Sequence, residues 1–169
     1  MRARVLAPTL ALLTWLAGAA QAQTVTVTAP GGQSANVNEA QLRDLHRISV
    51  TAAYGDHHVY AGAPLGDLLA LVGAPSDARL HGPVLDQVVV VTGSDGFYSV
   101  LSLAETSAAF RDQPVILADE EDGKPLDAKE GPFRLVIGGD LKPARSVRMV
   151  VSLELRPIAG PAAASAAKP

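Results

Sequence analysis

The sequence contains no cysteine in its 169 residues. This absence excludes a thiol nucleophile, a disulfide exchanger, an iron–sulfur cluster, covalently attached c-type haem and any metal site built on thiolates. It does not prevent folding, because a domain of this size buries enough apolar surface to fold without disulfides. The missing residue type therefore restricts the chemistry more than the stability.

Aromatic residues and positive charge are also scarce. Aromatics make up 4% of the chain, and its one tryptophan, Trp15, lies in the predicted signal peptide described below. Few aromatics means few stacking platforms for nucleic-acid bases. The formal net charge is −3, and it becomes −5 if Arg2 and Arg4 leave with the signal peptide. An acidic protein lacks the basic surface that nucleic acids require, so no nucleic-acid partner is expected.

Residues 1–22 have the pattern of a secretory signal peptide. Two arginines near the start precede a mostly apolar run over residues 5–19, and Ala20-Gln21-Ala22 matches an A-x-A cleavage site. We expect cleavage after Ala22 and a periplasmic or secreted mature protein. The alternative is an uncleaved membrane anchor, which the short run interrupted by Pro8 disfavours. No later segment is apolar enough to span a bilayer, so no membrane association is expected after cleavage.

The mature chain is predicted to be one α+β domain over residues 23–156, with a mostly β mixed sheet of about seven to nine strands and about three short helices. Period-two alternation and β-branched runs predict strands at residues 24–28, 48–53, 59–61, 88–91, 97–101, 114–118, 133–137 and 149–155. The helices do not alternate regularly with the strands, which excludes a doubly wound parallel sheet. The Ala/Pro composition of residues 157–169 predicts a disordered tail.

Local signals place the three predicted helices. Capping-box spacing predicts helix starts within residues 38–41 and 102–105, and the second of these helices is expected to run to about Phe110. Between them, Pro64 occupies a first helical position and Gly73 closes the helix.

The strongest candidate site lies in residues 131–148. A predicted strand ends in Gly138-Gly139-Asp140, where the two glycines allow backbone N–H groups to converge on an anion. Arginine can hold phosphate through two parallel hydrogen bonds. We therefore expect an anion or cofactor site built from the cations of this segment, which are Arg134, Lys142, Arg145 and Arg148. The alternative is that these cations pair with solvent or with the acidic run 119–122, which is expected to form a solvated turn.

Histidines and tyrosines supply weaker candidates. His57 and His58 are adjacent, and neighbours in a strand point to opposite faces, so the pair does not predict a metal site. His57 is a candidate hydrogen-bond partner of a ligand, and surface or helix-cap roles are the alternative. Tyr98 follows an Asp-Gly hairpin turn and is a candidate pocket residue, although aromatic core is the expected use of at least two of the three tyrosines. No motif for a nucleophile, a P-loop or a dinucleotide site is present, so catalytic residues stay unknown.

An ordered set of short motifs resembles one known family. The set contains residues 60–69 (YAGAPLGDLL), 88–91 with 95–97, 102–105, 117–119 with 122–126, 131–136, 139–140 and 144–148 (ARSVR). In this order, over roughly residues 24–156, the motifs resemble the molybdopterin-binding domain of the sulfite-oxidase family, and most of all the small exported proteins that carry this domain alone.

This resemblance implies a mainly β fold that holds a molybdenum–pterin cofactor through a cysteine thiolate and catalyses oxygen-atom transfer. The cysteine would fall within residues 48–53, where the sequence has none, and the chain is shorter than the full enzymes. The cofactor's phosphate could still be held by the cations of residues 131–148.

Three functions are therefore open at this point. The first is an exported binding module for a pterin-type or other anionic small molecule, without redox turnover. The second is a molybdopterin-dependent oxidoreductase that uses a non-cysteine metal site or a partner subunit. The third is a periplasmic accessory or interaction protein. The sequence leaves open whether the chain is an enzyme and whether it holds any cofactor.

Overall fold

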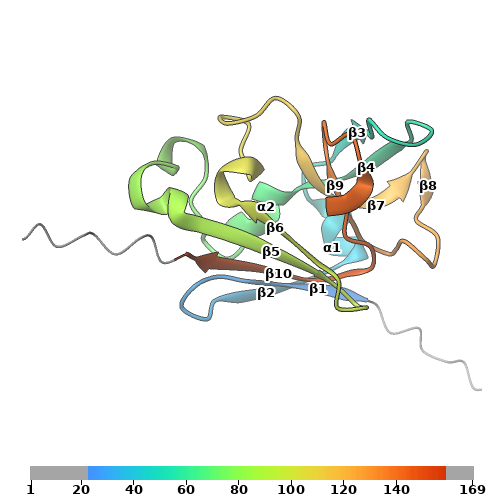
Figure 1. Ribbon diagram of the computed structural model, residues 1–169. Helices are drawn as coiled ribbons and strands as arrows, with labels where there is room; N and C mark the ends of the chain where they lie inside the picture. Colours follow the sequence, from blue (N-terminus) through green and yellow to red (C-terminus); the bar gives the residue numbers. More distant parts are fainter. Residues whose placement is uncertain (1–22, 159–169) are drawn as a thin grey trace, which may run out of the picture.

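The computed structural model describes residues 23–158, which form two five-stranded sheets (Figure 1). The first sheet has the order β2-β1-β10-β5-β6. Its strands are β1 (Thr24–Thr28), β2 (Ser34–Asn38), β5 (Gln87–Gly93), β6 (Tyr98–Ser102) and β10 (Val150–Pro157). β1 pairs with β10 in parallel and the other neighbours pair antiparallel, so the sheet is mixed.

The second sheet has the order β3-β4-β7-β8, and β9 also pairs with β7. Its strands are β3 (Ile48–Thr51), β4 (Val59–Pro64), β7 (Val115–Glu121), β8 (Lys124–Pro125) and β9 (Arg134–Ile137). β4 and β7 approach closely at a register shift beside Gly62, where a side chain would meet the carbonyl oxygen of Leu117. All neighbours in this sheet pair antiparallel.

The helical segments are short, as expected. They are α1 (Glu39–Asp44), α2 (Leu65–Ala70) and the 3₁₀ segments Asp77–Arg79, Gly82–Asp86, Leu103–Thr106 and Pro143–Arg145. Both predicted capping boxes are present. The third predicted helix is one 3₁₀ segment that ends at Thr106 rather than near Phe110, and Pro64 is the N-cap of α2 rather than its first residue. The predicted α+β class with a mostly β core is confirmed.

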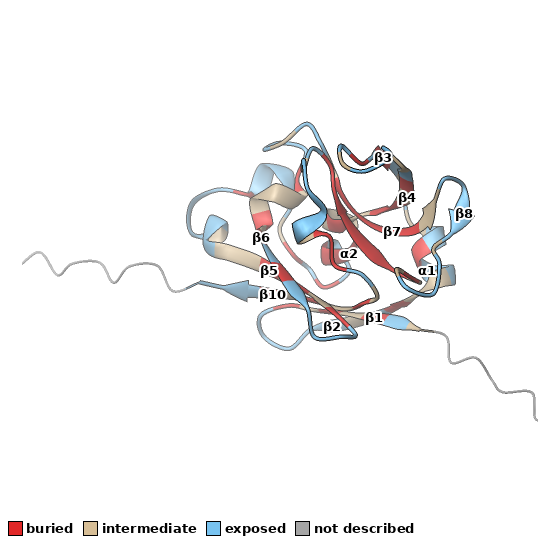
Figure 2. Ribbon diagram, turned by 45° about the vertical axis from the view of Figure 1, so that its right-hand side comes forward, coloured by how far each residue is buried: buried red, intermediate tan, exposed pale blue. Residues whose placement is uncertain are grey.

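Side-chain alternation in the second sheet separates two apolar clusters. On β9 and its approach, Phe133, Leu135 and Ile137 join the main core against the first sheet and α2. Val136 faces the opposite side, into a smaller cluster with Val50, Ala52, Tyr60, Ile116 and Ala118. β7 is therefore covered on both faces over most of its length, as Figure 2 shows.

The C-terminal end of the last strand differs from the prediction. Pro157 is the last residue of β10, paired with Gln87, and the N–H of Ile158 donates to the carbonyl of Asp86, so the strand continues past the predicted end of the domain. A proline is tolerated at the end of a strand. The predicted signal peptide and the rest of the predicted tail, residues 159–169, lie outside the described residues. Within residues 23–158, no helix is long and apolar enough to cross a membrane.

The acidic run 119–122 is not a solvated turn, and that prediction is wrong. Asp119, Glu120 and Glu121 belong to β7, and only Asp122 enters the turn to β8. Asp119 is buried because its carboxylate binds two arginines, Arg43 at 3.1 Å and Arg47 at 2.8 Å. These arginines come from α1 and the segment after it, so the carboxylate ties the helix to the second sheet.

Candidate functional site

Arg134 is the buried centre of the candidate site. Alternation along β9 turns its side chain away from Phe133 and the main core, as predicted. Arg134 is 3% exposed, its Cζ lies 4.8 Å from the ring centroid of Tyr60, and its Nη1 donates a 2.8 Å hydrogen bond to the Tyr60 hydroxyl. Its Nε is buried and has no hydrogen-bond partner among the described residues. A buried charge needs counter-charge, and here it comes from one carboxylate.

That carboxylate is Glu130, which joins Arg134 to Arg148. One oxygen of Glu130 pairs with Nη1 of Arg134, and the other lies 3.2 Å from Nη2 of Arg148. Glu130 is mostly buried, whereas the Arg148 side chain is 54% exposed. The N–H of Met149 donates to the Glu130 carbonyl at 2.9 Å, which holds the two segments together. Two arginines from different segments thus converge on one carboxyl group, a cluster that we call the Glu130 triad.

The far side of Tyr60 continues into a chain of polar contacts. Its hydroxyl donates to Glu121 at 2.8 Å, and burial, reinforced by this bond, raises the pKa of Tyr60 well above its ordinary value. Glu121 also lies 3.6 Å from His58, whose Nδ1 is 2.6 Å from Asp122. The hydrogen bond with Asp122 raises the pKa of His58.

Arg145 belongs to a different cluster. Its guanidinium binds both oxygens of Asp140, at 3.0 and 2.7 Å, and also lies 3.2 Å from Glu105. The bonds with Asp140 raise the pKa of Arg145. Arg111 approaches the same Glu105 at 3.8 Å and donates to the carbonyl of Gly138. This arrangement is a network of ion pairs in which each arginine already has a partner.

At the two glycines, where an anion site was expected, backbone N–H groups bond to backbone carbonyls of the same chain. The N–H of Gly138 donates to the carbonyl of Pro114 at 2.9 Å, and the N–H of Asp140 donates to Ile137 at 3.3 Å. Gly139 has a positive φ of 82°. Since two of these N–H groups bond to backbone carbonyls, the turn does not present a converging set of free donors.

The other three predicted site residues lie apart from the Glu130 triad. Lys142 is exposed and forms no ion pair with another described residue. His57 is exposed at a positive φ of 58°, with Nδ1 3.2 Å from the carbonyl of Ala52. Tyr98 is 62% exposed on β6, the edge strand of the first sheet. Of the six predicted residues, the structure brings together Arg134 and Arg148. Whether any of the six contacts a cofactor stays a prediction.

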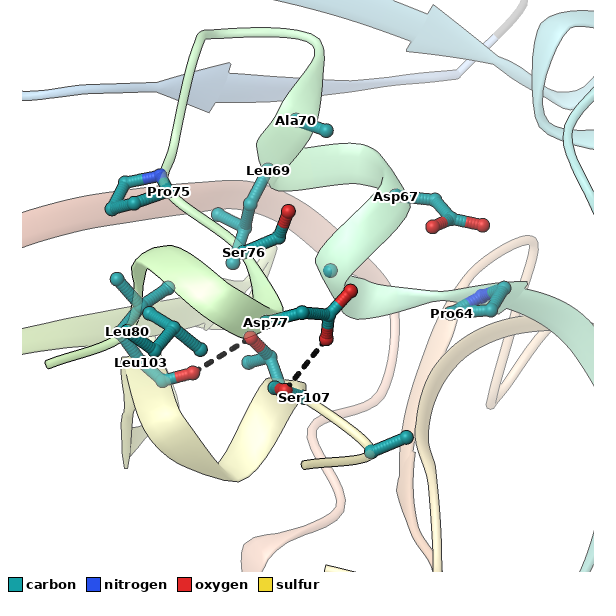
Figure 3. Close-up of a pocket in the computed structure, with 13 residues that line it drawn as sticks. Pro64, Asp67, Leu69, Ala70, Pro75, Ser76, Asp77, Leu80, Leu103 and Ser107 are labelled. Atoms are coloured by element: carbon teal, nitrogen blue, oxygen red, sulfur yellow. Dashed lines mark hydrogen bonds between the residues drawn. The ribbon is translucent and has the colours of Figure 1, made fainter. Parts of the chain in front are cut away.

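Two hollows flank the segment that follows β6, and neither is lined by the predicted residues. One, of about 220 Å³, lies between α2 and residues 75–80, where Ser107 donates to Asp77 at 2.8 Å (Figure 3). The other, of about 330 Å³, has mainly apolar walls that include Ile48, Pro64 and Val115, with Arg111 at its edge. Within the part of the chain that the structure describes, no group of three or more His, Asp or Glu side chains is arranged to hold a metal ion.

Comparison with known proteins identifies the family. The oxidoreductase molybdopterin binding domain matches residues 10–161. The chain belongs to this family. The sulfane dehydrogenase SoxCD from Paracoccus pantotrophus has a similar fold, with a TM-score of 0.55 and 17% sequence identity, over 79% of this chain and 38% of that one. The chain thus spans well under half of the SoxCD chain that it matches. A search of curated proteins found no match.

Membership of the molybdopterin-binding family makes the missing cysteine decisive for the metal. The strand where the cysteine was expected is β3, and its inward residues, Val50 and the following Ala52, are buried against Tyr60. Neither side chain carries a heteroatom that could bind molybdenum. The sequence has no cysteine elsewhere, so a thiolate-ligated molybdenum centre does not fit this chain.

Glu130 is the site residue that sequence reasoning missed. The expected counter-ions of the cations were residues 119–122, but the arginines bind Glu130, Asp140 and Glu105 instead. Glu130 stands four residues before Arg134, a spacing that predicts contact in a helix but not in the turn found here. Tyr60 was expected in the core or in a pocket. Its contact with Arg134 joins residues 74 positions apart in the sequence.

Proposed function

We propose that this chain is an exported binding module of the molybdopterin-binding family, which takes a small anionic ligand, a pterin phosphate included, without cysteine-ligated molybdenum catalysis. The observation that carries the proposal is the convergence of Arg134 and Arg148 on one point now held by the Glu130 carboxylate. The proposed export rests on the signal-peptide pattern of residues 1–22.

The physical case for an anion is the geometry of the two guanidinium groups. An arginine fork binds two oxygens of one oxyanion, and a neighbouring arginine adds a third contact. Nη1 of Arg134 and Nη2 of Arg148 each contact one oxygen of the Glu130 carboxylate. Nε of Arg134 has no hydrogen-bond partner within residues 23–158. An oxyanion in the place of the Glu130 carboxylate can supply one oxygen to each guanidinium group.

The case against ordinary molybdenum chemistry is the aliphatic lining of β3. Oxygen-atom transfer in this family depends on a metal that the protein must hold and orient. Here the inward positions at the expected ligand, Val50 and Ala52, offer only hydrocarbon contacts. The proposal is therefore binding rather than turnover.

The experiment titrates the purified chain with inorganic phosphate and with a phosphorylated pterin by calorimetry. Arg148→Ala should weaken binding about tenfold or more, because a hydrogen bond to a charged group contributes about 1.5–3 kcal/mol. Arg156→Ala is the matched control, because Arg156 is an exposed arginine of the first sheet whose ion pair among the described residues is with Glu154. Equal effects of the two variants, or no binding to the unmodified chain at millimolar concentration, would refute the proposal.

Metal analysis of the same preparation separates binding from redox function. We expect no stoichiometric molybdenum, because the sequence has no cysteine to supply the thiolate. Stoichiometric molybdenum that survives dialysis would instead favour the hypothesis of a molybdopterin-dependent oxidoreductase.

A further inference from the structure

We infer that the Glu130 carboxylate occupies the position of the ligand, so that an oxyanion must displace the Glu130 side chain in order to bind. The group that binds there is a doubly charged tetrahedral oxyanion of the phosphate or sulfate class. This inference rests on the proposed function and adds to it the order of events and the chemistry of the recognised group.

Charge balance in the Glu130 triad is the first argument. Two guanidinium groups face one carboxylate, which leaves one positive charge uncompensated within the triad. A dianion in the place of the Glu130 carboxylate would neutralise the charges of both arginines. A monoanion there would neutralise only one of them, as the Glu130 carboxylate already does. Site charge therefore favours phosphate or sulfate over a carboxylic acid.

The manner of pairing is the second argument. Both carboxylate oxygens of Asp140 accept hydrogen bonds from Arg145, which is the bidentate geometry of a structural ion pair. Glu130 instead divides its two oxygens between two arginines, Arg134 and Arg148. A tetrahedral oxyanion can place one oxygen at Nη1 of Arg134 and a second at Nη2 of Arg148, and it keeps further oxygens for water at the exposed side of Arg148.

The local backbone allows the Glu130 side chain to leave alone. The Asp127 carboxylate accepts the N–H of Lys129 at 2.8 Å and that of Glu130 at 3.0 Å, and the Asp127 carbonyl accepts the N–H of Gly131 at 2.8 Å. The Glu130 carbonyl accepts the N–H of Met149. These bonds hold the main chain of Glu130 without using its carboxylate, so displacement needs only side-chain rotation. Arg148 is half exposed, so it is the member of the Glu130 triad that solvent reaches most easily.

The test measures inorganic phosphate binding by calorimetry in the full chain and in Glu130→Gln. The glutamine keeps the size of the side chain but removes its charge, so the dissociation constant for phosphate should fall at least tenfold. Glu154→Gln is the control, because Glu154 pairs with one arginine among residues 23–158, Arg156, and the change should leave phosphate binding as it is. Adding Arg148→Ala to Glu130→Gln should abolish the gain.

A second variant covers the case in which Glu130→Gln does not fold. Glu130→Asp keeps the charge but shortens the side chain, and it should tighten phosphate binding by a smaller factor. A phosphorylated pterin titrated in parallel separates the sources of the oxyanion. If it binds with the same affinity as inorganic phosphate, the site recognises the oxyanion alone. If it binds more tightly, the pterin ring also contributes to binding.

The outcomes are distinguishable. If Glu130→Gln and the unmodified chain bind phosphate equally and Arg148→Ala weakens both, the displacement inference is wrong while the proposed function stands. If Glu130→Gln binds more tightly but Arg148→Ala has no effect, the anion lies elsewhere and both are wrong. Absence of binding in every folded variant overturns both as well.

Discussion

Tyr60 contacts the guanidinium of Arg134 through both its ring and its hydroxyl, with 4.8 Å between Cζ and the ring centroid and 2.8 Å between Nη1 and the hydroxyl oxygen. The same hydroxyl donates to Glu121 at 2.8 Å. A cation over an aromatic face is attracted by the ring, and more strongly when both are buried. Tyr60 therefore fixes the orientation of the arginine that Glu130 pairs with.

Removing the Tyr60 hydroxyl should destabilise the fold measurably. Tyr60→Phe keeps the ring but takes away a bond to Arg134 and a bond to Glu121, and we expect a loss of about 1–2 kcal/mol in the free energy of unfolding by urea. Tyr98→Phe is the control, because the Tyr98 hydroxyl lies on an exposed strand edge, and it should change the stability by less than about 0.5 kcal/mol. Equal stability of the two variants would mean that the polar chain through Tyr60 contributes nothing.

The two arginines of residues 145–148 should respond differently to truncation. Arg145→Ala removes the bonds with Asp140 and Glu105, and we expect a loss of about 1 kcal/mol, reduced by the partial exposure of the arginine. Arg148→Ala removes one ion pair from an exposed side chain and should cost less than about 0.5 kcal/mol. The same urea titrations measure both. A larger loss for Arg148→Ala would make that residue structural and weaken its assignment to the ligand.

Asp119 should be the most sensitive carboxylate of the acidic run. Asp119→Asn removes the charge that Arg43 and Arg47 share, and we expect a loss of about 2 kcal/mol, since both arginines can still reach water. The side chain of Glu120 forms an ion pair with Arg47 at 3.5 Å and is more exposed, so Glu120→Gln is expected to cost less than about 1 kcal/mol. Chemical denaturation of the two variants side by side gives the comparison. Similar losses would contradict the central role of the buried carboxylate.

The contact between His58 and Asp122 predicts a pH window. The hydrogen bond with Asp122 raises the pKa of His58 above 6.5, so the stabilisation is fully present below 6.5 and is lost as the pH rises through the folded-state pKa. Bonds from the N–H of Val59 and from His58 lower the pKa of Asp122 below 3.8, so its share is present above 3.8 and is lost as the pH falls through the lowered value. The contact therefore contributes most between these two limits.

Nuclear magnetic resonance titration of the His58 ring tests this window. Asp122→Asn should move the His58 pKa down, toward 6.5, whereas Asp56→Asn should move it much less because Asp56 acts only through a weaker charge interaction. Identical shifts in the two variants would show that the contact with Asp122 is not formed in solution.

Local signals in the sequence predict local structure well here. The capping boxes at residues 38–41 and 102–105 involve atoms three residues apart, and both are present. The alternation of β9 correctly separates Phe133 from Arg134. β2 was missed because Ser34-Ala35-Asn36-Val37-Asn38 has residues that disfavour strands, and it is a strand only because it pairs along β1.

Partner choice between distant charges could not be predicted. Asp119 pairs with an arginine 72 residues away and Arg145 with a glutamate 40 residues away, and several other carboxylates were equally available in the sequence. The cationic segment was found because arginine chemistry is visible in sequence. Its neutralisation by Glu130 was not, because it depends on how the turn before β9 meets the segment after Arg145.

The position of β10 has a consequence for the timing of folding. This last strand lies between β1 and β5, so the hairpin at the start of the chain and the β5–β6 hairpin share no neighbour until residues 150–157 have been synthesised. A nascent chain that lacks this segment leaves the inner edges of both hairpins open and lacks Val150, Leu153 and Leu155 from the core. The first sheet therefore closes only after residues 150–157 have been added to the chain, because β10 is the strand that joins the two hairpins.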